Sequence, residues 1–183
     1  VFNMSKQCIL TVTMNCIINI PYIPSYLGYR EVPAYINIIE YVKNKHPDLM
    51  PQVIIVDGNG YWHPRRCGSA TMLAVMANIP CIGVAKKLLG FDGMDRKTIL
   101  PFCKQHIPNK GDTKEFSLPS GEVLGSIMNA TGNCNNADKL NYISVGSGLT
   151  LDLATLIVKM FSEYRNNDLI RHADKKSRGI DVK

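Results

Sequence analysis

One stretch of the sequence, VIIVDGNGYWHPRRCGSA (Val53–Ala70), combines an acid, a histidine and two arginines with several glycines. Asp57 ends a run of aliphatic residues, and ligands of open α/β sheets bind at the carboxyl ends of strands. Gly58 and Gly60 place bare backbone beside this carboxylate, which leaves room for a flat ligand, and His63 follows closely. The simpler alternative is an aspartate that caps a turn, because Asp-Gly and Asn-Gly pairs favour tight turns.

Two other charged residues are candidates for the same site. Lys86 follows the aliphatic run PCIGVA, in which Gly83 again removes a side chain, and Glu31 stands in REVP beside an arginine. Two carboxylates at one edge can hold Mg²⁺, which activates water and stabilises the leaving oxygen in phosphodiester cleavage. A lysine can offset charge in the transition state. The alternatives are that Glu31 stabilises a helix dipole and that Lys86 is a solvated charge.

Hydrophobic patterns predict the elements that position these residues. Helical spacing of apolar residues predicts a helix over Arg30–Lys45 with Pro33 in its first turn, so that Glu31 stands at or just before the helix start. The stretch from Gln52 to Asp57 is almost continuously apolar, as in a central strand covered on both faces. A helix over residues 67–78 and a strand over residues 80–85 complete a parallel strand–helix–strand unit.

The two ends of the chain contribute further predicted elements. Cys8–Asn15 is rich in β-branched residues, which predicts a strand. Glu115–Met128 predicts a hairpin, Tyr142–Ser147 a strand, and Leu151–Tyr164 a helix with Thr150 as its N-cap. These elements predict one α/β domain with a mixed sheet flanked by helices.

Charge and composition narrow the class of protein. The chain of 183 residues has 21 lysines and arginines against 15 acids, and its net charge of +6 suits a nucleic-acid partner without requiring one. Tyr22 and Tyr26 lie in a proline-rich loop, where they could stack on bases or pack on the surface. The sequence contains no P-loop, no GxSxG and no zinc-ligand spacing of cysteine or histidine. It also has no apolar run of about 20 residues and no signal-peptide pattern at its start, which predicts that it neither spans a membrane nor is secreted.

Three ordered motifs make the sequence resemble the Endonuclease V family. They are PYIPSYLGYREVP, LMPQVIIVDGNGYWHPRRCGSA and IPCIGVAKKLL, and their wording is closest to the animal members. The resemblance implies a ribonuclease H-like fold and a nuclease that depends on Mg²⁺, with Mn²⁺ as a substitute. The family recognises inosine and cuts the second phosphodiester bond on its 3′ side, leaving 5′-phosphate and 3′-hydroxyl ends.

The resemblance also implies roles for individual residues. Glu31 and Asp57 would be catalytic metal ligands, and Lys86 would assist catalysis. The wedge that parts strands and supports a flipped base would consist of Pro21, Tyr22, Ile23 and Pro24. The base pocket would be lined by Gly58, Gly60 and Gly83, with His63 nearby. The arginines that follow this histidine would contact phosphate.

The expected substrate and setting follow from the same resemblance. The animal members prefer single-stranded RNA that contains inosine, and the bacterial members act on inosine in DNA. The resemblance therefore implies a monomeric enzyme for inosine-containing RNA, with DNA as a second substrate. It also implies a cytoplasmic or nuclear location, the nucleolus included.

The sequence departs from the family pattern at two places. A first strand with an aspartate in a pattern like GVDVSF is absent, so residues 1–183 are expected to form a single domain that is incomplete at its N-terminus. The family motif VGHR reads VGSG here, so Ser147 stands where the family has a site histidine, and Asp152 aligns with a nearby acid. These departures leave a second hypothesis, an inosine-binding protein that has lost cleavage.

Overall fold

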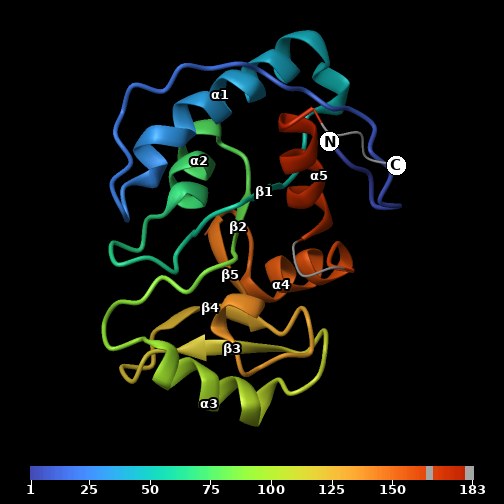
Figure 1. The fold of residues 1–183 in the computed structure, drawn as a ribbon. Coiled ribbons are helices and arrows are strands. Elements are labelled where there is room, and N and C mark those ends of the chain that lie inside the picture. Colours follow the sequence, from blue (N-terminus) through green and yellow to red (C-terminus); the bar gives the residue numbers. More distant parts are fainter. Residues whose placement is uncertain (164–166, 180–183) are drawn as a thin grey trace.

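The computed structural model describes residues 1–163 and 167–179. Within these residues the chain forms a five-stranded sheet in the order β1-β2-β5-β4-β3 (Figure 1). The strands are β1 (Ile54–Val56), β2 (Cys81–Ala85), β3 (Thr113–Ser117), β4 (Val123–Met128) and β5 (Asn141–Ser147). β1 and β2 are parallel, and the other neighbouring pairs are antiparallel. The predicted mixed sheet and its parallel strand–helix–strand unit are therefore confirmed.

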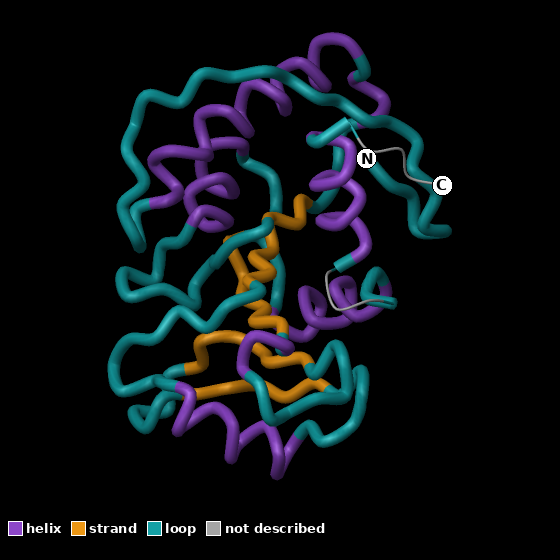
Figure 2. The backbone as a smooth tube through the Cα atoms, viewed as in Figure 1, coloured by secondary structure: helices purple, strands orange, loops and turns teal. Residues whose placement is uncertain are grey.

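Helices cover both faces of this sheet, as the tube in Figure 2 shows. The helices α1 (Leu27–Lys45) and α2 (Ser69–Ala77) pack on one face, and α4 (Leu151–Met160) and α5 (Asp168–Ser177) pack on the other. The helix α3 (Arg96–His106) lies beneath β3 and β4 (Figure 1). Two short 3₁₀ turns, η1 (Pro47–Leu49) and η2 (Ala137–Lys139), complete the elements.

Strand β2 is the one that joins these layers. All five of its residues are buried, and alternate side chains point to opposite faces of the sheet. Ile82 and Val84 pack with Val158 of α4, whereas Cys81 packs with Leu73 of α2. Because β2 is packed on both faces, its end is held in place, and the backbone of Lys86, the next residue, is held with it.

The predicted strand over Cys8–Asn15 is wrong. In this segment the backbone makes a single β-bridge, between Phe2 and Cys8, and then runs without regular structure across the outer side of α1 (Figure 1). The Arg30 side chain donates a hydrogen bond to the Ile20 carbonyl at 2.8 Å, which ties the end of the segment to α1. β-Branched composition produces a strand only where a neighbouring strand is available to pair, and this segment lies against a helix.

The predicted start of α1 is also wrong. The helix begins at Leu27, so Glu31 and Pro33 lie inside its second turn and not at its start. Pro33 has no N–H to donate to the carbonyl of Tyr29, but its ring faces solvent, where water can satisfy that carbonyl. As a consequence Glu31 is presented from the side of a helix, one turn from its N-terminus.

Strand β1 differs from its predicted position. Instead of lying centrally with both faces covered, it is three residues long and stands at the edge of the sheet, paired with β2 alone among the described strands. Val56 is buried, whereas Ile54 and Ile55 are only half-buried. An apolar run indicates burial, but it does not distinguish an edge strand from a central one.

Two helices were not predicted from the sequence, and one was predicted too long. The side chain of Asp95 accepts the backbone N–H of Thr98 at 2.9 Å and thereby caps α3. The helix α5 lies in the basic tail, and α4 ends at Met160, before Tyr164, which lies outside the described residues. Among the described helices, none is both long enough and apolar enough to cross a membrane.

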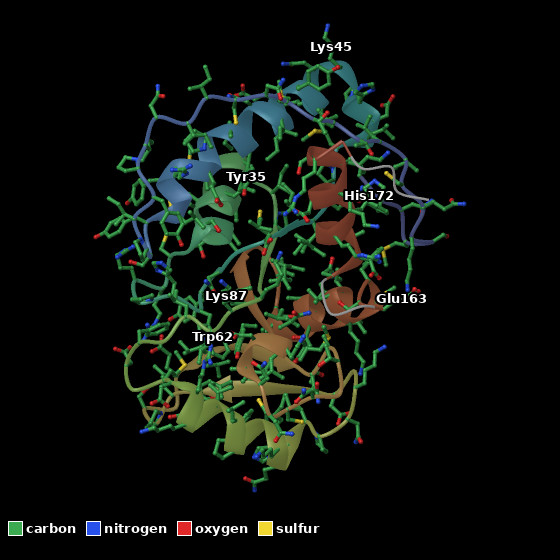
Figure 3. All side chains as sticks on the ribbon, in the orientation of Figure 1. Tyr35, Lys45, Trp62, Lys87, Glu163 and His172 are labelled. Atoms are coloured by element: carbon green, nitrogen blue, oxygen red, sulfur yellow. The ribbon has the colours of Figure 1, made fainter. Side chains whose placement is uncertain are left out.

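Trp62 anchors the loop that follows β1 in the hydrophobic core. Its side chain is completely buried, and it lies above the β3–β4 hairpin in Figure 3. The indole stacks on Phe116 with ring centroids 5.3 Å apart and meets Tyr142 edge-on at 5.4 Å. A single aromatic side chain therefore fixes the middle of the loop that also carries Asp57.

We expect Trp62→Ala to lower the free energy of unfolding by about 3–5 kcal/mol, the usual effect of deleting a buried large aromatic side chain. Urea denaturation followed by circular dichroism would measure it. The matched control is Leu156→Ala on α4, where the leucine is 56% exposed, and this change should stay within about 0.5 kcal/mol. A loss of stability in Trp62→Ala no larger than in the control would contradict the anchoring role.

Candidate active site

The ends of β1 and β2 bring two oppositely charged predicted site residues into direct contact. Lys86 Nζ lies 2.6 Å from Asp57 Oδ2, and the two side chains are 28% and 45% exposed. The contact follows from the parallel pairing of β1 with β2, which places the residue after each strand at the same edge of the sheet. Exposed ion pairs contribute at most about 1 kcal/mol to stability, so the importance of this pair lies in where it holds the two groups.

Glu31 approaches the same edge from α1. Its carboxylate accepts a hydrogen bond from Tyr35 Oη at 3.1 Å. Partial burial raises the pKa of Glu31, the nearby Asp57 carboxylate raises it further, and the Tyr35 hydrogen bond opposes both effects. Burial and the adjacent Glu31 carboxylate likewise raise the pKa of the Tyr35 phenol. The Asp57 charge thus acts on the Glu31 carboxyl, with a smaller effect than burial or the Tyr35 hydrogen bond.

The two carboxylates fit a hard divalent cation. Mg²⁺ is commonly held by one or two carboxylates and completes its shell with water and substrate phosphates. Glu31 and Asp57 match that donor set, and their mutual repulsion would be relieved by a shared cation. Over residues 1–163 and 167–179, no group of three histidine, cysteine, aspartate or glutamate side chains is arranged to hold a metal ion.

The glycines of DGNG and of β2 hold backbone against backbone. A Cβ atom on Gly83 would lie 2.5 Å from the Gly60 nitrogen and 2.7 Å from the Asn59 carbonyl carbon. The Gly60 N–H donates to the Ser144 hydroxyl at 2.9 Å. Gly60 and Gly83 are buried in close packing between the loop and the sheet, and of the three glycines predicted to line the base pocket only Gly58 lines the pocket found beside the loop.

A pocket of about 130 Å³ opens beside this loop, between the start of α1 and the start of α2. Of the predicted base-binding residues, Tyr22, Gly58 and His63 line it. Pro21, Ile23 and Pro24 are exposed next to Tyr22 but are not part of the lining. Tyr26, which was considered for stacking on bases, lines it as well, and so do Asn59 and Leu89, which sequence reasoning did not single out.

His63 links the loop to the segment before α1. Its Nδ1 accepts the Arg65 N–H at 3.3 Å, so Nε2 carries the proton that it donates to the Ser25 carbonyl at 3.0 Å. Burial lowers the pKa of His63, and the nearby Arg65 charge lowers it further, which favours this neutral form. The Arg65 guanidinium also donates to the Ser25 carbonyl and lies 3.9 Å above the Tyr26 ring.

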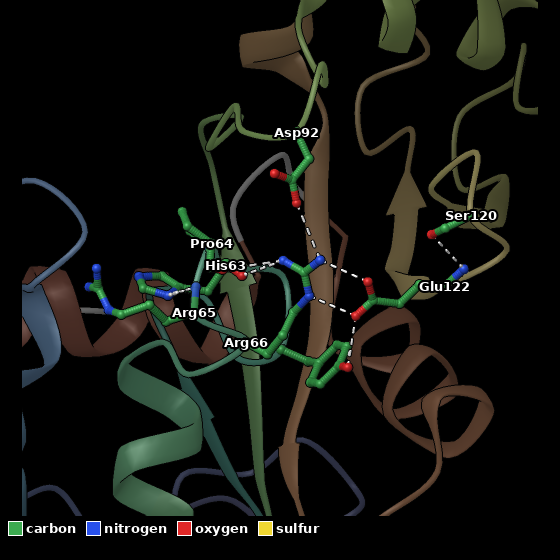
Figure 4. Close-up of polar contacts among 8 residues, drawn as sticks. His63, Pro64, Arg65, Arg66, Asp92, Ser120 and Glu122 are labelled. Atoms are coloured by element: carbon green, nitrogen blue, oxygen red, sulfur yellow. Dashed lines mark hydrogen bonds and ion pairs between the residues drawn. The ribbon is translucent and has the colours of Figure 1, made fainter.

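Arg66 is bound inside the protein, and the expectation that it contacts phosphate is not supported. Its guanidinium donates to both carboxylate oxygens of Glu122, at 2.6 and 2.7 Å, and to Asp92 at 3.3 Å (Figure 4). Tyr61 Oη donates to the same Glu122 at 2.8 Å. Arg66 therefore joins the β1–α2 loop to the β3–β4 hairpin.

Ser147 and Asp152 are not brought to the carboxylates. Ser147 is paired with Cys81, the first residue of β2, whereas Lys86 follows the last. At about 3.3 Å per residue, Ser147 lies roughly 13 Å along β2 from Ala85. Asp152 is exposed in the first turn of α4. The position expected to stand for the family histidine is thus at the far end of β2.

Sequence reasoning also missed four residues that bind or support the site from outside its predicted motifs. Tyr35 is four residues after Glu31, a helical spacing that brings side chains together and could have revealed the pair. Ser144 and Glu122 are 84 and 56 residues from their partners Gly60 and Arg66, and no local pattern points to either. Ser25 acts through its backbone carbonyl, which any residue type would supply.

The Glu122 carboxylate should make the protein acid-sensitive. The two hydrogen bonds from the Arg66 guanidinium (the Arg66 fork) and then the hydrogen bond from Tyr61 lower the pKa of Glu122 from 4.5 to about 2 in the folded protein. Its contribution to stability is therefore present above the pKa of the unfolded chain and is lost as pH falls through about 2. Thermal unfolding of Glu122→Gln should show a lower Tm than the wild type near neutral pH, with a gap that closes as pH falls.

The matched variant for that measurement is Tyr61→Phe. It keeps the carboxylate and the Arg66 fork and removes only the smaller of the two contributions. Its Tm should therefore fall less than that of Glu122→Gln near neutral pH. A Tm difference for Glu122→Gln that stays constant down to about pH 2 would show that Glu122 does not titrate with a lowered pKa.

A family profile and two mammalian relatives identify the family of this chain. The Endonuclease V family profile matches residues 1–175. Endonuclease V of Mus musculus is 38% identical over 86% of this chain and 46% of its own length, and that of Homo sapiens is 35% identical over 86% and 55%. The chain thus spans about half the length of these relatives.

Solved structures agree with the sequence matches. A crystal structure of Ciona intestinalis Endonuclease V, in complex with a 23mer DNA containing an inosine followed by a ribo-adenosine, superimposes with a TM-score of 0.86. It is 32% identical and covers 96% of this chain and 73% of its own. The catalytic domain of human Endonuclease V gives a TM-score of 0.79 at 35% identity, over 88% and 65% of the two chains. The ribonuclease H-like fold is therefore confirmed, and this chain belongs to the Endonuclease V family.

Proposed function

We propose that this chain provides the active site of a divalent-metal-dependent endonuclease that cuts nucleic acid at inosine. The observation that carries the proposal is the joint placement of Glu31, Asp57 and Lys86 at one sheet edge, with the ion pair of 2.6 Å between the last two. A pocket lined by Tyr22, Gly58 and His63 opens beside the same loop. The Ciona relative, whose crystal contains inosine, supports the choice of base.

Each charged residue at the sheet edge would have a distinct role in cleavage. Glu31 and Asp57 would hold Mg²⁺ or Mn²⁺, which supplies charge neutralisation and an activated water when bound. Lys86, whose Nζ lies 2.6 Å from Asp57 Oδ2, would offset the negative charge of the scissile phosphate. Tyr35 holds the Glu31 carboxylate in place by its hydrogen bond.

The pocket would take the base after it leaves the stack. Extrusion of a base requires a few kcal/mol, which stacking on an aromatic side chain and hydrogen bonds to backbone can offset. Tyr22 is 65% exposed at the mouth of the pocket and is free to stack. Pro21, Ile23 and Pro24 would keep the wedge rigid, and cleavage would fall at the second phosphodiester bond 3′ to inosine, leaving 5′-phosphate and 3′-hydroxyl ends.

Single-stranded RNA is the preferred substrate in this proposal, and DNA is the second. The net charge of +6 favours either polyanion. A monomer with a single domain, located in the cytoplasm or the nucleus, the nucleolus included, completes the proposal.

A second function, inosine binding without cleavage, is favoured by one specific feature. Lys86 occupies one oxygen of Asp57, and no third carboxylate or histidine joins the pair within the described residues. Such a protein would keep the pocket and would bind inosine-containing RNA selectively, yet it would form no product at any concentration of Mn²⁺.

Cleavage of a single-stranded RNA with one inosine, with Mn²⁺ and with EDTA, tests both functions. We expect cleavage that EDTA abolishes and that Asp57→Asn reduces by at least about a hundredfold, because the carboxylate acts directly on the metal. Lys86→Ala should reduce kcat by a similar factor.

The matched control is Lys87→Ala. Lys87 is the exposed neighbour of Lys86, and its removal changes the charge equally without touching Asp57. Its kcat should stay close to that of the wild type. Undiminished cleavage by Asp57→Asn would place the chemistry elsewhere, and selective binding without product would establish the second function.

A further inference from the structure

The ion pair between Arg66 and Glu122 lies outside the proposed catalytic groups, yet it is the most fully bonded charged contact near the pocket. The five N–H groups of the Arg66 guanidinium have five acceptors: both oxygens of Glu122, Asp92 Oδ2, and the carbonyls of His63 and Pro64 (Figure 4). A guanidinium whose N–H groups all donate to acceptors within the protein has no free donor for a ligand. Its role is therefore to hold other groups in place.

The groups that Arg66 holds are those of the pocket wall. Its hydrogen bond to the His63 carbonyl at 3.1 Å fixes the same residue whose ring donates to the Ser25 carbonyl. Arg65, between them in the sequence, reaches the same Ser25 carbonyl and the Tyr26 ring. Arg66 points towards the β3–β4 hairpin, while His63 and Arg65 contact the segment before α1.

The backbone at both ends of this chain of contacts is under strain. Arg66 and Ser25 have φ angles of +52° and +64°, in the left-handed region that side chains other than glycine rarely adopt. Such conformations persist where surrounding contacts determine them. For Arg66 those contacts are its bonds to Glu122 and Asp92 together with the turn bond from its backbone N–H to the His63 carbonyl, and for Ser25 they are the bonds from His63 and Arg65.

We infer that Arg66 and Glu122 form a positioning clamp, which sets the His63–Arg65 turn against Ser25–Tyr26 and so determines the geometry of the base pocket. The inference deepens the proposed function and rests on it for the identity of the base. Neither Arg66 nor Glu122 lines the pocket. Glu122 lies in the β3–β4 hairpin and Ser25 in the segment before α1, so the effect of the clamp on Ser25 passes through His63.

Hydrogen exchange tests the clamp without any substrate. Glu122→Gln keeps the shape of the side chain and removes its charge, and Arg66→Lys keeps the charge and removes the fork. In both variants, amides within residues 22–29 should exchange about tenfold faster than in the wild type, because one charge-assisted hydrogen bond corresponds to at least that factor in an opening equilibrium. Arg96→Lys, which alters the exposed Arg96–Asp138 pair at 2.9 Å, is the matched control and should leave these amides unchanged.

The location of the change decides the inference. Faster exchange confined to residues 58–68 and 118–124 would show that Arg66 and Glu122 stabilise only their own loops, and would overturn it. This outcome is independent of nucleic acid, so it can be told apart from a failure of the proposed function.

Substrate discrimination gives the second readout. Both clamp variants should raise the KM for inosine-containing RNA by about tenfold to a hundredfold, the usual effect of a displaced binding group, with kcat at saturation nearly unchanged. Selectivity for inosine over adenosine should fall in parallel, whereas a merely structural defect would lower the amount of active protein and leave selectivity intact. Unchanged selectivity together with faster exchange at residues 22–29 would overturn the positioning role.

Discussion

The site depends on the direct contact between the backbone of the β1–α2 loop and strand β2. Gly83 has no side chain, so the Gly60 nitrogen and the Asn59 carbonyl can lie directly on the strand, where even a Cβ atom would come within 2.7 Å of them. This contact turns the chain sharply after Asp57. It leaves Asp57 at the edge of the sheet beside Lys86 and directs Trp62 into the core and His63 to the pocket. A chain that passed β2 at a normal packing distance would separate these groups.

The electrostatics of the edge follow from that packing. Asp57 and Lys86 remain partly exposed, so water screens their attraction and the pair can separate at little cost. Glu31 is half-buried, and its burial and the nearby Asp57 charge raise its pKa. A divalent ion bound beside Glu31 would offset the negative charge that raises the pKa of this carboxyl. In contrast, Arg66 and Glu122 share two hydrogen bonds and are held by further bonds to Asp92 and Tyr61, so this pair does not separate easily.

The sequence was most informative where a residue and its partner are near in the chain. The parallel pair β1 and β2, the helix between them and the hairpin around Pro119 follow from local periodicity and turn residues, and the resemblance placed Glu31, Asp57 and Lys86 together. The predicted strand over residues 8–15 failed because strand formation requires a partner that composition does not specify. Glu122 and Ser144 could not be found from the sequence, because their partners are distant in the chain and their residue types are common on any surface. Gly60 and Gly83 were identified as a pair, but whether a glycine admits a ligand or another stretch of backbone depends on the fold.

Strain and its compensation explain why the pocket is built from two separate parts of the chain. A left-handed residue other than glycine costs on the order of 1–3 kcal/mol. Here one such residue, Ser25, lines the pocket, and another, Arg66, directly follows the pocket residue Arg65. Contacts from other segments help to hold both residues. His63 and Arg65 donate to the Ser25 carbonyl. The Arg66 guanidinium donates to Glu122 and Asp92, in addition to the His63 and Pro64 carbonyls of its own turn. Each strained residue is therefore held more firmly when its partner segment is in place. This mutual support makes the pocket wall cooperative, since displacement of the Glu122 carboxylate weakens the contact of His63 with the segment before α1.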